Sequence, residues 1–288
     1  MQQPLFEHRL TLAGYVTRAL ELEGDGPPVL LLHGYADSAD TWRLALDLLA
    51  RRGRRALAVD LPGFGAATPL RGDQPVLAQH DRFVRAAVEH LAAEDGPIVL
   101  CGNSLGGCVA LRAAQDPELP LIGVVPVAPA GFDMPAWFRI IEGDRLVQAL
   151  LASPVPLPEP LVRGVVGEAY RRLAFARPRG VAGEVVAAFT AYHRTREAVI
   201  AHLATGRRLL PELRDCFQLD RIEAPVLLVW GDRDRMVTHR GARHLVDAIP
   251  GLAYELLEGV GHCPQLEAPE RFVGLLEDFA AGVSSARR

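Results

Sequence analysis

The chain has 288 residues, with 31 basic and 35 acidic side chains and hence a formal net charge of −4. All 31 basic residues are arginine, which excludes chemistry that needs a lysine amine: a Schiff base, a pyridoxal phosphate site or a phosphate-binding loop lysine. Apolar residues make up 49% of the sequence, enough for a sizeable core, and the net negative charge argues against a nucleic-acid partner.

Short apolar runs alternate with helical patterns along much of the chain. Strands are predicted over Glu7–Leu12, Tyr15–Glu21, Val29–Leu32, Arg55–Val59, Ile98–Cys101, Leu121–Val127, Pro225–Trp230 and Ala253–Leu257. Helices are predicted over Asp40–Arg52, Gln79–Ala92, Leu105–Ala114, His239–Ile249 and Glu267–Ala280. Because uninterrupted apolar runs are typical of strands covered on both faces, the alternation indicates an α/β fold with a mostly parallel sheet.

The alternation stops after the sixth predicted strand. From Phe132 to about Leu219 the sequence shows helical patterns broken by prolines, with no convincing strand. We therefore predict a core formed by residues 1–131 and 220–288, interrupted by a helical insertion over 132–219.

Ser104 is the candidate nucleophile. It lies in Gly102-Asn103-Ser104-Leu105-Gly106, between a predicted strand and a predicted helix, which is the context that a G-x-S-x-G nucleophile elbow requires. The turn is so sharp that side chains at 102 or 106 would clash with neighbouring elements, and the helix N-terminus can stabilise negative charge.

A serine hydroxyl needs a neighbouring base, and His262 is the candidate among nine histidines. It follows the last predicted strand, and loops at the carboxyl ends of parallel strands surround the site in this architecture. The acid that orients it is predicted to be Asp234, just beyond the strand that ends at Trp230. Asp232 is the weaker candidate and is expected to anchor the same turn.

Two backbone N–H groups are needed to stabilise the oxyanion of an acyl-transfer reaction. Leu105, directly after the nucleophile, supplies one of them, and we assign the second to Tyr35 in the loop His33-Gly34-Tyr35. His33 is expected to brace this loop and not to act as the base.

These segments resemble the α/β-hydrolase superfamily, in particular its capped branch of small-molecule esterases, cofactor-free haloperoxidases and meta-cleavage C–C hydrolases. The matching segments are residues 33–34 with Trp42, 60–65, 102–107, 230–234 and 261–262. The resemblance implies a sheet of about eight strands and a helical cap over the active site, formed by the insertion. Dehalogenases and epoxide hydrolases of this fold carry aspartate where Ser104 stands, which argues against alkyl-enzyme chemistry.

The insertion is the expected source of substrate contacts. Trp137 and Phe138 belong to an apolar cluster at its start and are the candidate substrate-binding residues, although such residues also form the core of a small helical unit.

The leading expectation is a serine hydrolase of small, largely apolar carboxylic esters that uses no cofactor and no metal. Hydrolysis of a C–C bond in a meta-cleavage diketone acid and a non-catalytic ligand receptor are the alternatives. The partner is expected to be a small-molecule substrate, bound by a monomer or homodimer. The first ten residues lack the apolar stretch of a signal peptide and no apolar run is long enough for a membrane span, so we expect a cytoplasmic location without membrane contact.

Overall fold

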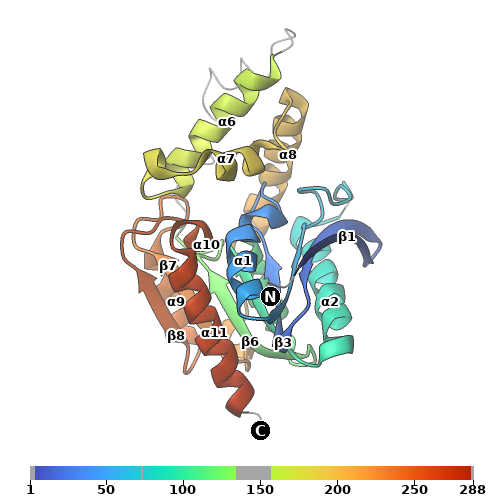
Figure 1. Cartoon of the computed structure of the whole chain (residues 1–288), viewed down its shortest axis with the longest axis vertical. Helices are drawn as coiled ribbons and strands as arrows, with labels where there is room; N and C mark the ends of the chain where they lie inside the picture. The colour runs from blue at the N-terminus through green and yellow to red at the C-terminus, as the bar shows by residue number, and fades with distance from the viewer. Residues whose placement is uncertain (1–3, 73, 134–156, 287–288) are drawn as a thin grey trace.

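The computed structural model describes residues 4–72, 74–133 and 157–286, and Figure 1 shows a central sheet flanked by helices with further helices above it. The strands are β1 (Leu5–Leu12), β2 (Tyr15–Leu22), β3 (Asp25–Leu32), β4 (Arg54–Val59), β5 (Ile98–Asn103), β6 (Leu121–Val127), β7 (Leu227–Gly231) and β8 (Ala253–Leu257). The helices are α1 (Arg43–Arg51), α2 (Val76–Asp95), α3 (Leu105–Ala113), α6 (Glu159–Ala174), α7 (Gly183–Thr190), α8 (Arg196–Glu212), α9 (Ala242–Ala248), α10 (Pro264–Glu267) and α11 (Pro269–Ala286). Short 3-10 turns over Ala39–Trp42 and His239–Gly241 lead into α1 and α9.

The eight strands form one sheet in the order β1-β2-β4-β3-β5-β6-β7-β8. The pairs β1–β2 and β2–β4 are antiparallel, and the remaining neighbours are parallel. The predicted sheet of about eight mostly parallel strands is therefore confirmed. Since β3 to β8 run in one direction, the loops at their carboxyl ends meet along one edge, where ligands bind in open α/β sheets.

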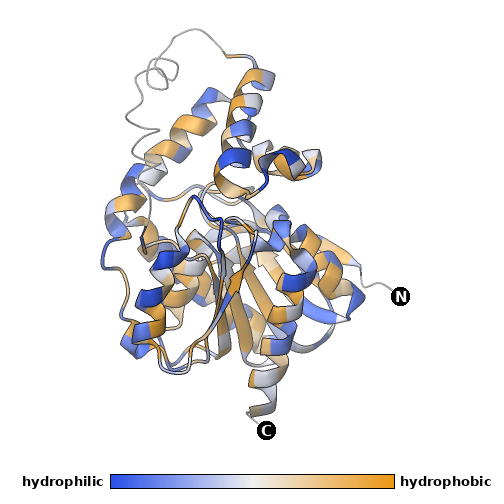
Figure 2. Ribbon diagram, turned by 90° about the vertical axis from the view of Figure 1, so that its left-hand side faces the viewer, coloured by the Kyte–Doolittle hydropathy of each residue, from blue (hydrophilic) through white to orange (hydrophobic). Residues whose placement is uncertain are grey.

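Two apolar cores lie on opposite faces of the sheet. Leu30 and Leu32 of β3 pack into the core that α2, α3 and α9 cover, whereas Val29 and Leu31 pack into the core that α1 and α11 cover. Figure 2 shows the apolar strands between these helices. This arrangement explains why β3 is a continuous apolar run, because both of its faces are buried.

Helices α6, α7 and α8 form a layer beyond the carboxyl edge of the sheet, which we call the α6–α8 layer (Figure 1). It is fastened to α2 by Glu212, whose carboxylate accepts hydrogen bonds from the backbone N–H groups of Val76 and Leu77, both at 2.8 Å. The first N–H groups of a helix have no partner within the helix, and Pro75 offers no side-chain cap. Glu212 therefore caps α2 from outside, where a negative charge is also favoured by the helix dipole.

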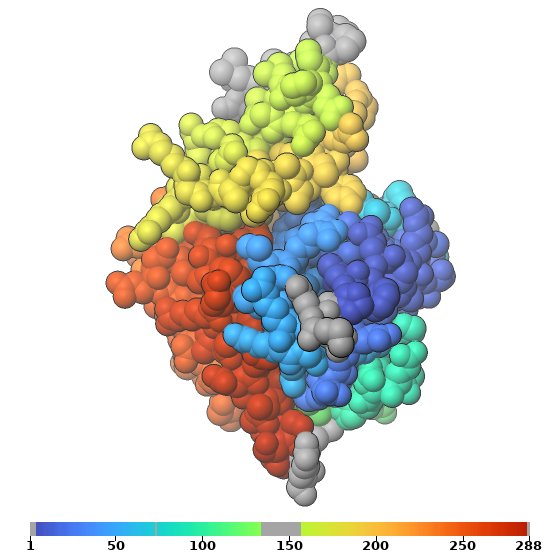
Figure 3. All heavy atoms as spheres, viewed as in Figure 1, coloured from blue at the N-terminus to red at the C-terminus, as the bar shows by residue number. Residues whose placement is uncertain are grey.

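A second attachment joins the layer to the loop before α10. The backbone N–H of His262 donates to the carbonyl oxygen of Ala174 at 2.7 Å. The carboxylate of Glu267 accepts from the N–H groups of Gly261 and Ala176 at 2.7 and 2.8 Å. The layer thus rests on both the early (blue) and late (red) parts of the chain, as Figure 3 shows.

Several predicted boundaries were wrong by part of a turn or more. Helix α2 begins at Val76 and not Gln79, because Glu212 satisfies its first turn. Helix α11 continues to Ala286 and not Ala280, because Val283 extends its buried face. Among the residues that the structure describes, no helix has both the length and the apolar character needed to cross a bilayer.

Candidate active site

Ser104 occupies a strained turn between β5 and α3. Its backbone has φ 56° and ψ −113°, a positive φ that costs a non-glycine residue about 1–3 kcal/mol. A Cβ at Gly102 would lie 2.3 Å from the carbonyl carbon of Gly106, and a Cβ at Gly106 would lie 2.3 Å from the carbonyl oxygen of Leu32. Both glycines are therefore required for β5, the turn and α3 to pack this closely, as an elbow demands.

His262 and Asp234 form a buried pair. The Nδ1 atom of His262 donates to Oδ2 of Asp234 at 2.7 Å, and the Asp234 side chain has no exposed surface. The other oxygen of Asp234, Oδ1, accepts from the backbone N–H groups of Met236 and Val237 at 2.8 and 3.0 Å. The indole N–H of Trp230 also donates to Oδ2, at 3.2 Å. These donors hold the carboxylate in place.

Asp232 has a different environment. Its Oδ1 accepts from the backbone N–H of Gly259 at 2.7 Å, which ties the turn after β7 to the loop after β8. Of the two acids that follow β7, Asp234 is the one that contacts His262.

Ser104 and His262 open onto the same cavity of about 380 Å³. Tyr35 and Leu105, which is the first residue of α3, also line this cavity. The Nε2 atom of His262 is buried and has no hydrogen-bond partner among the described residues, so the serine and histidine do not hydrogen-bond in this structure. Such contacts are often long in an empty site and shorten when substrate binds.

The loop after β3 lies against the candidate nucleophile. A Cβ at Gly34 would lie 3.2 Å from Cβ of Ser104. His33 braces this loop, since its Nδ1 donates to the carbonyl of Gly34 at 2.7 Å and its Nε2 accepts from the N–H of Leu61 at 2.8 Å. Burial lowers the pKa of His33, in agreement with a neutral imidazole that donates and accepts at once. The Tyr35 hydroxyl donates to the carbonyl of His202 in α8.

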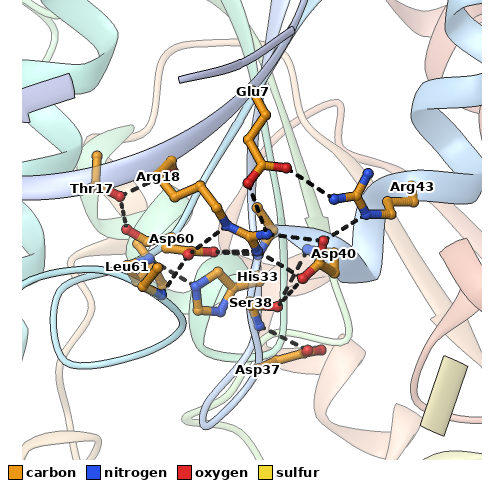
Figure 4. Close-up of polar contacts among 12 residues, drawn as sticks. Glu7, Thr17, Arg18, His33, Asp37, Ser38, Asp40, Arg43, Asp60 and Leu61 are labelled. Carbon is orange, nitrogen blue, oxygen red and sulfur yellow. Dashed lines mark hydrogen bonds and ion pairs between the residues drawn. The ribbon is translucent and has the colours of Figure 1, made fainter. Parts of the chain in front are cut away.

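An ion network holds the far side of this loop (Figure 4). The carboxylate of Asp60, with no exposed surface, accepts from Nε of Arg18 at 3.1 Å and from the N–H groups of Ala39 and Ala66, both at 2.7 Å. Arg18 also makes two hydrogen bonds to Asp40, at 3.2 and 2.8 Å. One buried arginine thus joins β2, the loop after β3 and the loop after β4.

The carbonyl of His262 is held by a second buried network. Nδ2 of Asn103 donates to this oxygen at 2.9 Å. The amide of Gln265 in turn donates to Oδ1 of Asn103 at 3.3 Å and to the Thr41 hydroxyl at 3.2 Å. Asn103, which precedes Ser104, therefore fixes the loop that carries His262.

The cavity wall formed by the α6–α8 layer is mostly aliphatic and aromatic. It is lined by Leu157, Leu161, Val162, Val165, Val166, Ala169, Leu173, Phe189, Val199, Leu203, Leu209, Leu210 and Leu213. The predicted substrate-binding residues Trp137 and Phe138 lie outside the described residues. The cavity wall fits an apolar ligand group.

Polar lining residues that the sequence did not suggest are Asp37, Tyr170, His193 and Arg196. His202 also lines the cavity. Rings contact one another in a series from α2 to α6: His80, Phe64, His202, His193, Phe189 and Tyr170. All of these pairs are stacked except His202 and His193, whose rings are tilted. Burial lowers the pKa of His202 to about 4, so its ring is neutral at neutral pH. The signal available in the sequence was the aromatic spacing of Phe189 and His193 on one helical face, which is equally typical of a core.

Cys101 and Cys263 are buried, and burial raises the pKa of each thiol, so neither resembles a reactive cysteine. Within the described ranges no group of three or more His, Cys, Asp or Glu side chains is placed to hold a metal ion.

Comparisons with known proteins agree with this architecture. Residues 29–275 match the sequence profile described as the alpha/beta hydrolase family. An uncharacterised protein of Mycobacterium tuberculosis is 31% identical over 281 residues, covering 93% of this chain and 79% of its own. Monoacylglycerol lipase ABHD6 of Bos taurus is 26% identical over 274 residues, covering 91% and 77%.

A solved structure has the same fold. The 2-hydroxy-6-oxo-6-phenylhexa-2,4-dienoate hydrolase of Rhodococcus sp. strain RHA1 superimposes with a TM-score of 0.76 at 21% identity, covering 96% of this chain and 98% of that one. With the profile match spanning most of its length, the chain belongs to the alpha/beta hydrolase family.

Proposed function

We propose that this hydrolase is a serine carboxylesterase that acts on small, largely apolar esters through an acyl-enzyme intermediate. The observation that carries the proposal is that Ser104, on its strained turn, shares a cavity with His262, whose Nδ1 is bound by Asp234. This is the arrangement that activates a serine hydroxyl for attack on a carbonyl.

The reaction follows from the hydrogen bond between His262 and Asp234. Because Nδ1 of His262 donates to Asp234, Nε2 is the nitrogen free to take the proton of Ser104 as Oγ attacks the ester carbonyl. The backbone N–H groups of Tyr35 and Leu105 stabilise the oxyanion. His262 then returns the proton to the leaving alcohol, and in the second half it activates the water that releases the acid.

The apolar walls favour an acyl chain as the group held beneath the α6–α8 layer. We infer that this layer, within residues 132–219, acts as a cap over the site. The relation to monoacylglycerol lipase ABHD6 of Bos taurus supports an ester with a single acyl chain.

Hydrolysis of a C–C bond is the second candidate function, because the segment Gly102-Asn103-Ser104-Leu105-Gly106-Gly107 resembles the corresponding segment of the meta-cleavage C–C hydrolases. Against it, the glycine-rich loop typical of those enzymes is replaced here by Tyr35-Ala36-Asp37-Ser38. The third candidate function is that of a ligand receptor that does not turn over its ligand.

The test is fluorophosphonate labelling together with a panel of p-nitrophenyl esters from acetate to decanoate. Wild type is compared with Ser104→Ala and with Ser285→Ala, which changes an exposed serine on α11 as a control. Labelling and turnover that persist in the control and vanish in Ser104→Ala are the expected result. Labelling without ester turnover would favour C–C hydrolysis, and no labelling of wild type would refute a serine hydrolase and favour the receptor.

A further inference from the structure

Asp37 is a buried acid in the cavity wall that the proposed reaction does not use. It lies in the loop after β3 and is 9% exposed. Its Oδ1 accepts from the backbone N–H of Ser38 at 2.8 Å, and the Thr41 hydroxyl is a second partner. Asp37 differs from the two nearby acids Asp40 and Asp60. Both of these form ion pairs with Arg18, whereas Asp37 has no ion pair among the described residues. Figure 4 shows it at the margin of that network.

Two further polar side chains share this part of the wall. Tyr170 of α6 and Cys263 pack in one cluster, and both lie near Asp37. All three line the cavity, and we call them the polar wall. Burial raises the pKa of Asp37 to about 7, so this acid has little solvation and would gain from a hydrogen-bond partner in a ligand.

The position of the polar wall indicates which half of a bound ester lies near it. In the proposed reaction His262 delivers a proton to the leaving alcohol, so that alcohol must lie against His262. Cys263 follows His262 directly, and Asp37 lies two residues after Tyr35 in the loop after β3. An alcohol held against His262 would therefore lie nearest the polar wall, and the acyl chain would extend along the aliphatic residues of the α6–α8 layer.

We propose that Asp37 is a specificity-determining residue that accepts a hydrogen bond from a free hydroxyl group on the leaving alcohol. The preferred substrates are then single-chain acyl esters of alcohols that carry a second hydroxyl, and not esters of plain alkanols. This inference rests on the proposed esterase function. A cationic amine is disfavoured as the occupant, because it would lose its hydration to a mostly apolar cavity in exchange for one acid.

The experiment compares 2,3-dihydroxypropyl octanoate with propyl octanoate, which share the acyl chain and differ only in the two hydroxyl groups. The measured quantity is the ratio of the two kcat/KM values, because the acyl-enzyme and its hydrolysis are common to both esters. At pH 8.5, above the pKa of Asp37, one hydrogen bond to the ionised carboxylate predicts a preference of about 10–100-fold for the dihydroxypropyl ester in wild type. We expect the ratio to fall close to one in Asp37→Leu and to an intermediate value in Asp37→Asn, which keeps one acceptor and the Ser38 contact.

Asp47→Asn, which changes an acid on the outer side of α1, is the matched control and should leave the ratio unchanged. Wild type without a preference, equal losses on both esters in Asp37→Asn, or a stronger preference for a 2-aminoethyl ester would each overturn the proposal. Fluorophosphonate labelling of Ser104 separates a failure of the proposed role of Asp37 from a failure of the proposed esterase function. Labelled enzyme that hydrolyses both esters equally refutes only the role of Asp37, whereas unlabelled enzyme that hydrolyses neither refutes the esterase and this inference with it.

Discussion

Replacing Asp60 by asparagine tests whether the network around Arg18 holds the loop after β3. The change keeps the size of the side chain but replaces one carboxylate oxygen by an amino group. That group then faces the N–H of Ala39 or Ala66, each of which now donates to Asp60 at 2.7 Å. Arg18, whose side chain is only 11% exposed, loses one of its two buried counter-charges and keeps Asp40.

Removal of one partner from a buried ion pair costs about 3–5 kcal/mol, because the remaining charge stays desolvated. We therefore expect Asp60→Asn to lower the free energy of unfolding by that amount, measured by equilibrium unfolding in urea. The matched control is Glu7→Gln in the same network. Glu7 is 54% exposed and lies 3.8 Å from Arg18 and 3.3 Å from Arg43, and exposed pairs of this kind contribute about 0–1 kcal/mol.

A role of Asp60 in holding this loop would be refuted by a free energy of unfolding within about 1 kcal/mol of wild type in Asp60→Asn. It would also be refuted by an equally large loss in Glu7→Gln. Because Ala39 belongs to the segment that follows Tyr35, we also expect Asp60→Asn to lower kcat. The Glu7→Gln variant should keep it.

Two further predictions concern single acids. Asp234→Asn should reduce kcat by about 10⁴, because the amide no longer fixes the imidazole tautomer, whereas Asp232→Asn should leave kcat within a few-fold; equal losses in steady-state assays would contradict the assignment of Asp234. Asp37 makes stability depend on pH, because its pKa rises from 3.8 in the unfolded chain to about 7 in the fold, so the folded state binds the proton more tightly. Its contribution is complete below pH 3.8 and is lost as the pH rises through 7. The loss is about 1.4 kcal/mol per pH unit from pH 5 to about pH 7, where it ends, so it amounts to about 3 kcal/mol in total between pH 5 and pH 8. Asp37→Asn should remove this loss, so that urea midpoints show the variant gaining on wild type at pH 8; an equal difference at both pH values would refute it.

The sheet was predictable because its parallel strands are buried on both faces. Runs such as Val29–Leu32 and Leu121–Val127 are too short for typical helices and lie between turn residues, so they indicate buried strands. Ser104 is predicted for a related reason, since a sharp turn between buried elements requires glycines at fixed positions, and His262 is predicted because it follows the last strand.

The cavity wall was much less predictable. Asp37, Tyr170 and His193 come from three separate elements, and no local pattern connects them. Helix boundaries in the insertion were also beyond the sequence, because residues such as Leu161 and Val165 face the cavity and blur the usual division between an apolar and a polar side. The start of α2 depended on Glu212, a residue far away in the chain.

The bond from Trp230 to Asp234 also has an optical consequence. The indole N–H of Trp230 donates to the same carboxylate oxygen that His262 contacts, and its second partner is the carbonyl of Val237 at 3.0 Å. Indole emission responds to charge placed beside the ring, so the fluorescence of Trp230 reports the electrostatic state of the histidine–aspartate pair without an added label. With Trp42 and Trp137 replaced by phenylalanine, the protein would carry a single tryptophan, at the back of its candidate active site.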